Sequence, residues 1–139
     1  MSDLSSFAVV VDEAARTAQA IPQLTEMAAL TVDEAYAIQA LSLARRYARG
    51  ERRVGMKMGL TRRIKMAQVD VSEMVWGRLT DSMRVEEGGA ISRARFVHPR
   101  AEPEIAYLLK APLAGDVTIA EAMAAVGDSG ATALVVQLG

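Results

Sequence analysis

The sequence predicts an α+β fold in which helices come first and a strand-rich region with a further helix follows. Two helical patterns precede residue 50, apolar residues alternate with other residues from Val54 to Gly59, and a second strand pattern runs from Glu104 to Leu109. The 139 residues have the length of one ordinary domain, and 51% of them are hydrophobic. We therefore expect a single domain over 1–139, with a helical part at 1–50 and a strand-rich part at 51–139.

The first helix is predicted to start at Asp3 or Ser5, either of which can cap it, and to run to about Ala20. Ile21-Pro22 should then end it, because the residue before a proline avoids the helical conformation.

Two later helices share a capping box, in which a threonine is followed three residues later by a glutamate. Thr31 and Glu34 open the second predicted helix, and Gly50 suits the left-handed position after its end. Thr118 and Glu121 repeat the pattern and predict a helix close to the end of the sequence.

Other local patterns complete the expected elements. Thr61 can cap a short helix to about Val69, Gly88-Gly89 indicates a turn, and Ala131–Leu138 is typical of a strand. Trp76 and the eight methionines are interpreted as core residues.

Charge and composition argue against several functional classes. The formal net charge is -1, and Glu51 and apolar residues interrupt the basic residues between Arg45 and Lys65, so we interpret them as a solvated face and expect no nucleic-acid partner. The absence of cysteine excludes disulfides and thiolate chemistry. No apolar run reaches the roughly 18 residues of a membrane span, and no signal peptide is recognisable. We therefore expect no membrane association and a cytoplasmic location.

Two glutamates on one predicted strand are candidates for a metal site. In Glu102-Pro103-Glu104 the alternate residues point to one face, and two close carboxylates are costly unless a cation neutralises them. Mg²⁺ prefers such oxygen ligands. Pro103 has no N–H group, which predicts a strand end or a pocket rim. Glu-x-Glu pairs also occur on solvated strand edges, so the metal interpretation is not the only one.

Lys57 is a second candidate. It lies between Met56 and Met58 and is flanked further out by glycines. A desolvated lysine has a lowered pKa and can transfer protons, and a charged lysine can bind a carboxylate. The alternative is an ordinary lysine that points outward from a half-buried strand. His98, the single histidine, precedes a proline and is interpreted as a turn or packing residue.

These segments together resemble the hydratase/decarboxylase family of the fumarylacetoacetate hydrolase superfamily. The resemblance rests on Val54–Thr61, Lys65–Gln68, Trp76–Leu79 and His98–Ile105, and Lys65–Gln68 and Lys110–Gly115 are more similar to the decarboxylase branch. It implies an incomplete version of the fumarylacetoacetate-hydrolase-like fold, because the family chains are much longer.

The resemblance also implies roles for individual residues. Glu102 and Glu104 become ligands of Mg²⁺ or Mn²⁺, and Lys57 becomes a substrate-contacting or acid/base residue. The neighbouring substrate-binding positions are Gly59, Leu60 and Thr61. The third glutamate of the family pattern falls on or near Leu134, and Asp128 is the carboxylate closest to that position, about six residues out of register.

The implied function is metal-dependent decarboxylation of 4-oxalocrotonate (2-oxo-3-hexenedioate) to 2-hydroxypenta-2,4-dienoate in the meta-cleavage catabolism of aromatic compounds. Two alternatives are a 2-oxopent-4-enoate hydratase on the same scaffold and a non-catalytic fragment that interacts with a full-length relative. The implied ligand is a small 2-oxo or 2-hydroxy dienoic acid. The implied protein partner is a second copy or a related hydratase.

Overall fold

The structure is a computed structural model that describes residues 3–60 and 74–137. Its contacts divide the chain into two compact units, Met1–Arg95 and Phe96–Gly139, and each unit is described by itself. This division does not fall near residue 50, where helices give way to strands along the sequence. The single domain over 1–139 stays a prediction.

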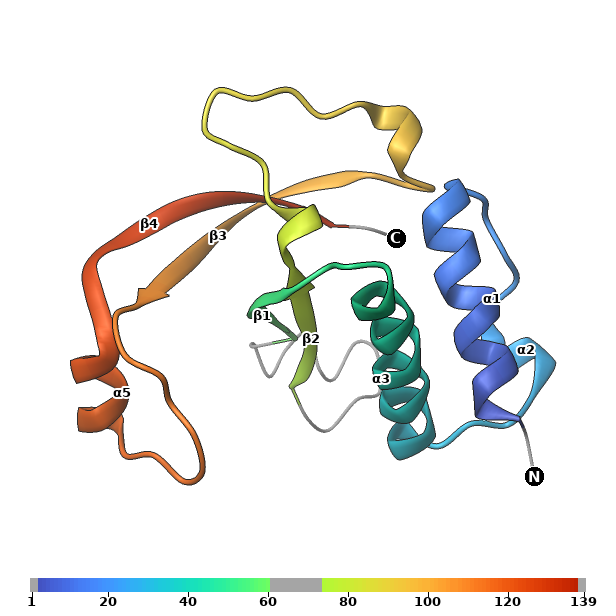
Figure 1. Cartoon of the computed structure of the whole chain (residues 1–139), viewed down its shortest axis with the longest axis horizontal. Coiled ribbons are helices and arrows are strands. Elements are labelled where there is room, and N and C mark those ends of the chain that lie inside the picture. The colour runs from blue at the N-terminus through green and yellow to red at the C-terminus, as the bar shows by residue number, and fades with distance from the viewer. Residues whose placement is uncertain (1–2, 61–73, 138–139) are drawn as a thin grey trace. The chain divides into compact units, whose positions relative to one another are not determined.

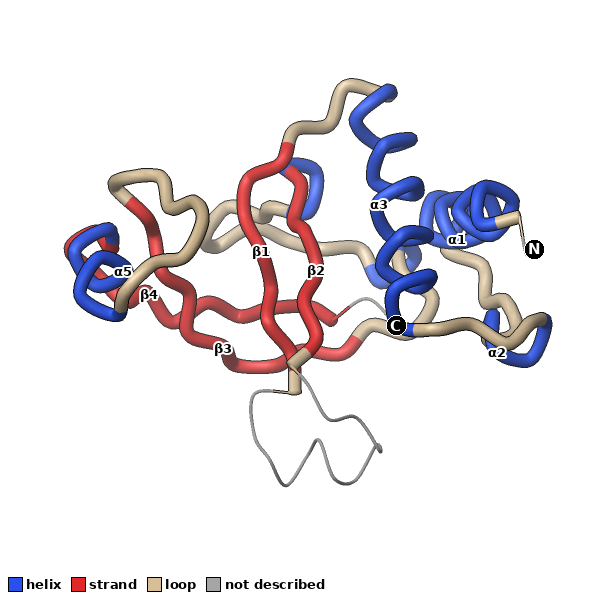
Figure 2. The backbone as a smooth tube through the Cα atoms, turned by 90° about the horizontal axis from the view of Figure 1, so that it is seen from below, coloured by secondary structure: helices blue, strands red, loops and turns tan. Residues whose placement is uncertain are grey.

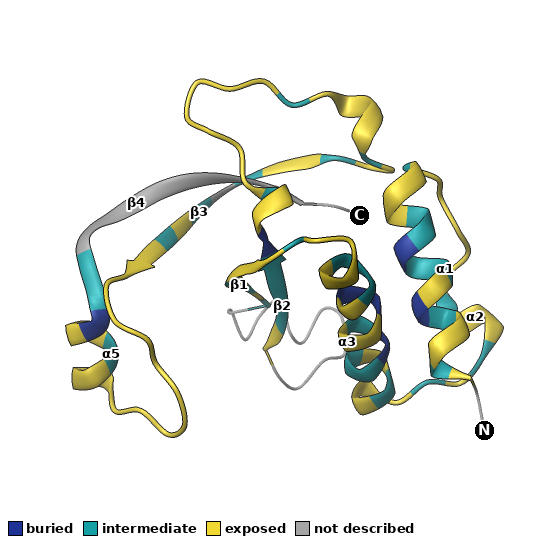
Figure 3. Cartoon of the chain, in the orientation of Figure 1, coloured by how far each residue is buried: buried dark blue, intermediate teal, exposed yellow. Residues whose placement is uncertain are grey.

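The helical part of the first unit consists of α1 (Leu4–Thr17), α2 (Leu24–Met27) and α3 (Val32–Ala48). α1 and α3 lie side by side (Figure 1). Their buried residues lie between the two helices (Figure 3) and include both apolar and polar side chains: Ala8, Asp12, Ile38, Ser42 and Leu43.

The predicted helix starts are confirmed. The Asp3 side chain accepts a hydrogen bond from the Ser5 N–H, and the capping box of Thr31 and Glu34 is fully formed. Gly50 follows α3 with φ of 98°, in the left-handed region that favours glycine.

The predicted end of the first helix is wrong by about three residues. α1 stops at Thr17 because Ala18 adopts a left-handed φ of 53°, and the Ala18 N–H bonds to the Ala14 carbonyl oxygen. The chain has therefore left the helix before Ile21-Pro22 is reached.

A hairpin of two antiparallel strands, β1 (Arg53–Gly59) and β2 (Val75–Thr80), follows α3 (Figure 2). Trp76 attaches β2 to α3. Its backbone N–H donates to the Tyr36 hydroxyl at 3.2 Å, and the Gln39 side-chain amide donates to its backbone carbonyl oxygen at 3.2 Å. The Tyr36 and Trp76 rings also stack, with centroids 4.7 Å apart. Two side chains of α3 thus hydrogen-bond to the backbone groups of β2 that point away from β1.

The interpretation of all methionines as core residues is wrong. Several are exposed, namely Met27, Met56, Met58, Met74 and Met123. Trp76 is half-buried. For Met56 and Met58 on β1, the reason is that an apolar residue type does not reveal whether anything packs on a strand. In the described part of the chain, β1 pairs with β2 alone.

The rest of the first unit contains the 3₁₀ helices η1 (Asp81–Met83) and η2 (Arg93–Arg95). The predicted turn at Gly88-Gly89 is confirmed, with φ of 74° at Gly88. The short helix predicted from Thr61 to about Val69 lies outside the described residues.

The second unit is a long antiparallel ribbon of β3 (Arg100–Leu109) and β4 (Val126–Gln137), with α5 (Ile119–Ala125) at one end (Figure 1). The predicted capping box of Thr118 and Glu121 is present at the start of α5. No helix within 3–60 or 74–137 has the length and apolar character needed to cross a membrane.

Both predicted strands of this ribbon are longer in the structure. β3 begins four residues before Glu104, so Pro103 lies inside the strand and not at its end. The β3–β4 sheet has two strands among the described residues, so each strand has one unpaired edge that tolerates a residue without an N–H group.

Candidate functional site

The carboxylate pair lies on a regular part of β3. The register with β4 is continuous from Arg100 to Tyr107, with Glu102 opposite Val135 and Glu104 opposite Ala133. Without a bulge between them, Glu102 and Glu104 share one face of the strand. Both glutamates are half-buried, whereas Ile105 is exposed.

This arrangement fits a hard divalent cation. Alternate residues of a strand lie about 6–7 Å apart, a spacing that two flexible glutamate side chains can close around one ion. Within the residues that the structure describes, no cluster of three or more acidic, histidine or cysteine side chains is suited to hold a metal. The described site therefore offers Glu102 and Glu104 as a pair. Leu134, where the resemblance places the third glutamate, is a residue type without an oxygen ligand.

Lys57 lies in the middle of β1 and is half-buried, and Met56 and Met58 on either side of it are 46% and 44% exposed. Its direct partner across the hairpin is Gly77. Directly opposite residues of an antiparallel pair share a face, as do alternate residues of one strand. Lys57 therefore has glycine neighbours on its own face, two along β1 and one across on β2, which we call the glycine face: Gly55, Gly59 and Gly77.

The three glycines differ in what packing requires of them. A Cβ atom at Gly59 would lie 3.0 Å from the Val75 Cγ2 atom, so a larger residue would crowd the hairpin. A Cβ atom at Gly55 would meet Leu79 at an ordinary 3.9 Å, and one at Gly77 would meet no described residue within 4 Å. Neither Gly55 nor Gly77 has a positive φ. The hairpin itself does not require glycine at these two positions, and they leave open space beside Lys57.

Leu60, directly after β1, has φ of 54°, a left-handed conformation that is uncommon for a branched side chain. Backbone conformations of this kind concentrate at binding and catalytic sites. Thr61, the last of the substrate-binding residues that the resemblance implies, lies outside the described residues.

The structure places these candidates in two separate units. Lys57 and Gly59 belong to Met1–Arg95, whereas Glu102 and Glu104 belong to Phe96–Gly139. Their assembly into one site stays a prediction. His98 is exposed and lies in a bend before β3.

One charged cluster was not predicted. Asp12 is 1% exposed, and its carboxylate accepts two hydrogen bonds from the Arg49 guanidinium, both at 2.7 Å, and one from Arg45 at 2.8 Å. The hydrogen bonds from Arg49 hold the pKa of Asp12 below its ordinary value, against the effect of burial. The two arginine side chains themselves remain 38% and 39% exposed, so they lie at the surface as expected, but their pairing with a buried carboxylate was not foreseen. Asp12 is more than 30 residues from them, so no local pattern reveals the pairing.

The fold and the candidate residues define a mixed helix-and-strand protein with a paired-carboxylate strand and a lysine-bearing hairpin. A scan against models of protein families finds no match. The sequence is 57% identical over 123 residues to a 4-oxalocrotonate decarboxylase of a Pseudomonas species, across 88% of this chain and 48% of that relative. It is 42% identical over 106 residues to the 2-hydroxyhexa-2,4-dienoate hydratase of Comamonas testosteroni, across 74% of this chain and 40% of the relative.

A solved structure gives the same result. The 4-oxalocrotonate decarboxylase from Pseudomonas putida G7, complexed with magnesium and adipate, matches with a TM-score of 0.82 and 34% identity. The match covers 88% of this chain and 48% of that chain. Over most of its length, this chain is similar to 4-oxalocrotonate decarboxylases and 2-hydroxydienoate hydratases. It spans about half the length, or less, of the curated relatives that it matches.

Proposed function

We propose that this chain contributes Lys57, Glu102 and Glu104 to a metal-dependent lyase that converts 4-oxalocrotonate to 2-hydroxypenta-2,4-dienoate and CO₂. The observation that carries the proposal is the unbulged stretch of β3, which gives Glu102 and Glu104 one common face. The relatives named as 4-oxalocrotonate decarboxylases and the magnesium-containing structure of one of them support it.

The reaction explains why a lysine and carboxylates are needed. The bond from carbon 5 to the remote carboxylate breaks, and its electron pair moves through the conjugated carbons to the 2-oxo oxygen, which then takes up a proton. A divalent cation, when bound by Glu102 and Glu104, supplies positive charge beside that oxygen. Lys57 can bind a substrate carboxylate or hold the proton that the oxygen receives. The glycine face leaves room for a flat, conjugated acid to lie beside the lysine.

The hydratase reaction is a second candidate. It is favoured by the similarity to the Comamonas testosteroni hydratase and to a 2-hydroxypent-2,4-dienoate hydratase of Pseudomonas putida, which is 40% identical over 98 residues. Both reactions develop charge on the same 2-oxo oxygen, so the metal ligands do not separate them. Assays with 2-oxo-3-hexenedioate and with 2-hydroxypenta-2,4-dienoate distinguish the two. The third candidate, a non-catalytic fragment, predicts turnover of neither compound.

The metal site is tested by Mn²⁺ binding, followed through the EPR signal of the free ion. We expect one Mn²⁺ to bind per chain, Mg²⁺ to compete for it, and Glu102→Gln or Glu104→Gln to weaken binding at least about tenfold, because each removes a charged ligand. The double variant should bind no Mn²⁺ at this site. Asp116→Asn, an exposed acidic residue of the same unit, is the matched control and should bind as the wild type does. Unchanged binding by the double variant would remove the proposed metal site.

The glycine face is tested by Gly77→Ala. Because the added methyl group meets none of the described residues and alanine loses less chain entropy than glycine, the hairpin should gain about 0.5–1 kcal/mol. The same methyl group should weaken binding of adipate, used as a dicarboxylate probe in the presence of Mn²⁺. Met56→Leu, on the other face of β1, is the control. A variant that is more stable but binds adipate as well as the wild type would show that the ligand does not use this face.

We also propose the finer features that the resemblance implies. These are a fumarylacetoacetate-hydrolase-like fold, a cytoplasmic location, and association with a second copy or a related hydratase. The mixed helix-and-strand architecture and the match to the solved decarboxylase support the fold. Sedimentation of the chain, alone and with a hydratase of the family, tests the association.

A further inference from the structure

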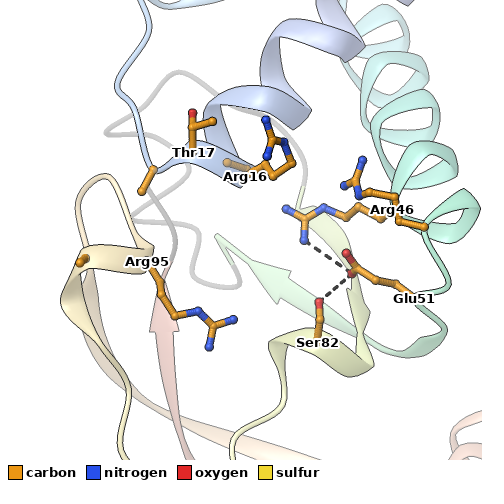
Figure 4. A pocket seen from close by; sticks show the side chains of 10 residues that line it. Arg16, Thr17, Arg46, Glu51, Ser82 and Arg95 are labelled. Carbon is orange, nitrogen blue, oxygen red and sulfur yellow. Dashed lines mark hydrogen bonds and ion pairs between the residues drawn. The ribbon is translucent and has the colours of Figure 1, made fainter.

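A pocket of about 370 Å³ lies within the first unit, and none of its lining residues belongs to the candidate metal and substrate site. It is formed by the ends of α1 and α3 and by residues of η1 and η2 (Figure 4). Its charged and polar lining residues are mainly arginines: Arg16, Arg46, Arg49, Arg95, Glu51, Thr17 and Ser82.

Glu51 is the one carboxylate among the residues that line this pocket, all of which lie in the described part of the chain. Its Oε2 atom accepts hydrogen bonds from the hydroxyl groups of Thr80 at 2.6 Å and Ser82 at 2.7 Å. Burial raises the pKa of Glu51, whereas these hydroxyl groups and the nearby arginines lower it. The lowering effects together are larger, so the pKa lies below its ordinary value. Glu51 therefore stays ionised, and the pocket lining holds one carboxylate and four arginines.

Two of these arginines are used within the protein. Arg49 makes a double hydrogen bond to the buried Asp12, and Arg16 binds Glu13 at 2.7 Å. These pairs explain why Arg16 and Arg49 occupy their positions without any ligand in the pocket.

Arg46 and Arg95 are different. The Arg46 side chain is 18% exposed, and its ion pair with Glu51 spans 3.8 Å, which is longer than a hydrogen bond. Across 3–60 and 74–137, neither the Arg46 nor the Arg95 guanidinium has a hydrogen-bond acceptor. The favourable position of a cation at the end of a helix explains Arg46 in the last turn of α3. It does not explain Arg95, which enters the same pocket from η2.

We propose that this pocket is a binding site for a small dianionic oxyanion, either phosphate or a dicarboxylate, held by Arg46 and Arg95. A guanidinium group presents parallel N–H donors that match two oxygens of a carboxylate or phosphate. Such an anion supplies hydrogen-bond acceptors that the described residues do not provide to these two guanidinium groups. Chloride, which lacks paired oxygens, should bind much more weakly. The site is separate from the proposed lyase site and does not depend on it.

The test is an NMR titration of the ¹⁵N-labelled full chain in EDTA, so that metal binding plays no part. Phosphate and adipate are added separately at constant ionic strength, with chloride as the reference. We expect saturable shifts at the amides that surround the pocket. Arg46→Gln and Arg95→Gln should each weaken binding about tenfold, the effect of losing a hydrogen bond to a charged group. Arg93→Gln, an exposed arginine of the same 3₁₀ helix outside the pocket lining, should have no effect.

The outcomes are distinct. Saturation by phosphate, by adipate or by both, with loss in Arg95→Gln, supports the site and identifies its ligand. Arg95 is exposed, so its variant should fold even if Arg46→Gln does not. The absence of saturable shifts with either anion, or equal affinity in Arg95→Gln and the wild type, would overturn the proposal.

Discussion

Replacing Asp12 with asparagine is expected to destabilise the first unit by about 2–3 kcal/mol. The substitution keeps the shape of the side chain but removes the charge that Arg45 and Arg49 share. Breaking a buried ion pair costs about 3–5 kcal/mol, and we take a smaller value because the two arginine side chains are 38% and 39% exposed. The measurement is urea unfolding followed by the fluorescence of Trp76, the single tryptophan, which stacks on Tyr36 of α3.

Glu13→Gln is the matched control for this experiment. Glu13 is the next residue along α1 and pairs with Arg16 and Arg45, but its side chain is 40% exposed. Its loss should therefore have a much smaller effect than that of Asp12. Equal effects of the two substitutions would show that the buried position of Asp12 does not matter.

The contribution of Asp12 should also depend on pH in a defined direction. The hydrogen bonds from Arg49 lower the pKa of Asp12 in the folded state below the ordinary 3.8. The unfolded state therefore takes up a proton first as the pH falls. The stability difference between the wild type and Asp12→Asn should be constant at neutral pH and should shrink as the pH falls below the ordinary value.

The parts of the fold that the sequence predicts correctly depend on neighbouring residues. A capping box uses two residues three positions apart, and both predicted boxes start a helix in the structure. Gly50 adopts its left-handed conformation for an equally local reason. The end of α1 was less predictable because Ala18, which ends it, has no side-chain signal for a left-handed conformation.

The candidate site divides in the same way. Glu102 and Glu104 share a face because strand alternation is a local property, and it follows once β3 is recognised. The space beside Lys57 was not predictable, because it depends on Gly77, which the hairpin register brings from 20 residues away. The buried Asp12 pair and the arginine pocket combine residues that only tertiary structure brings together.

The second large effect concerns catalysis. In an assay with 2-oxo-3-hexenedioate and saturating Mg²⁺ or Mn²⁺, we expect the isolated chain to turn over at least about a hundredfold more slowly than a full-length decarboxylase of the family. Two carboxylates leave the position of the ion to water and substrate, and misplacement of a reacting group by about 1 Å is enough to cost a hundredfold in rate. The isolated chain also spans about half the length of its relatives, so fewer residues are present to exclude water from the site.

This assay requires a monodisperse sample, because β3 exposes a run of large apolar side chains that favour association: Ile105, Tyr107, Leu108 and Leu109. A full-length decarboxylase provides the reference rate, and Lys57→Ala provides the control for any residual rate. If the isolated chain matches the full-length rate, the two-carboxylate explanation is wrong. A further carboxylate, from Asp128 or from a second copy of the chain, would then have to complete the site. Turnover that rises with the square of the chain concentration would identify the second copy as its source.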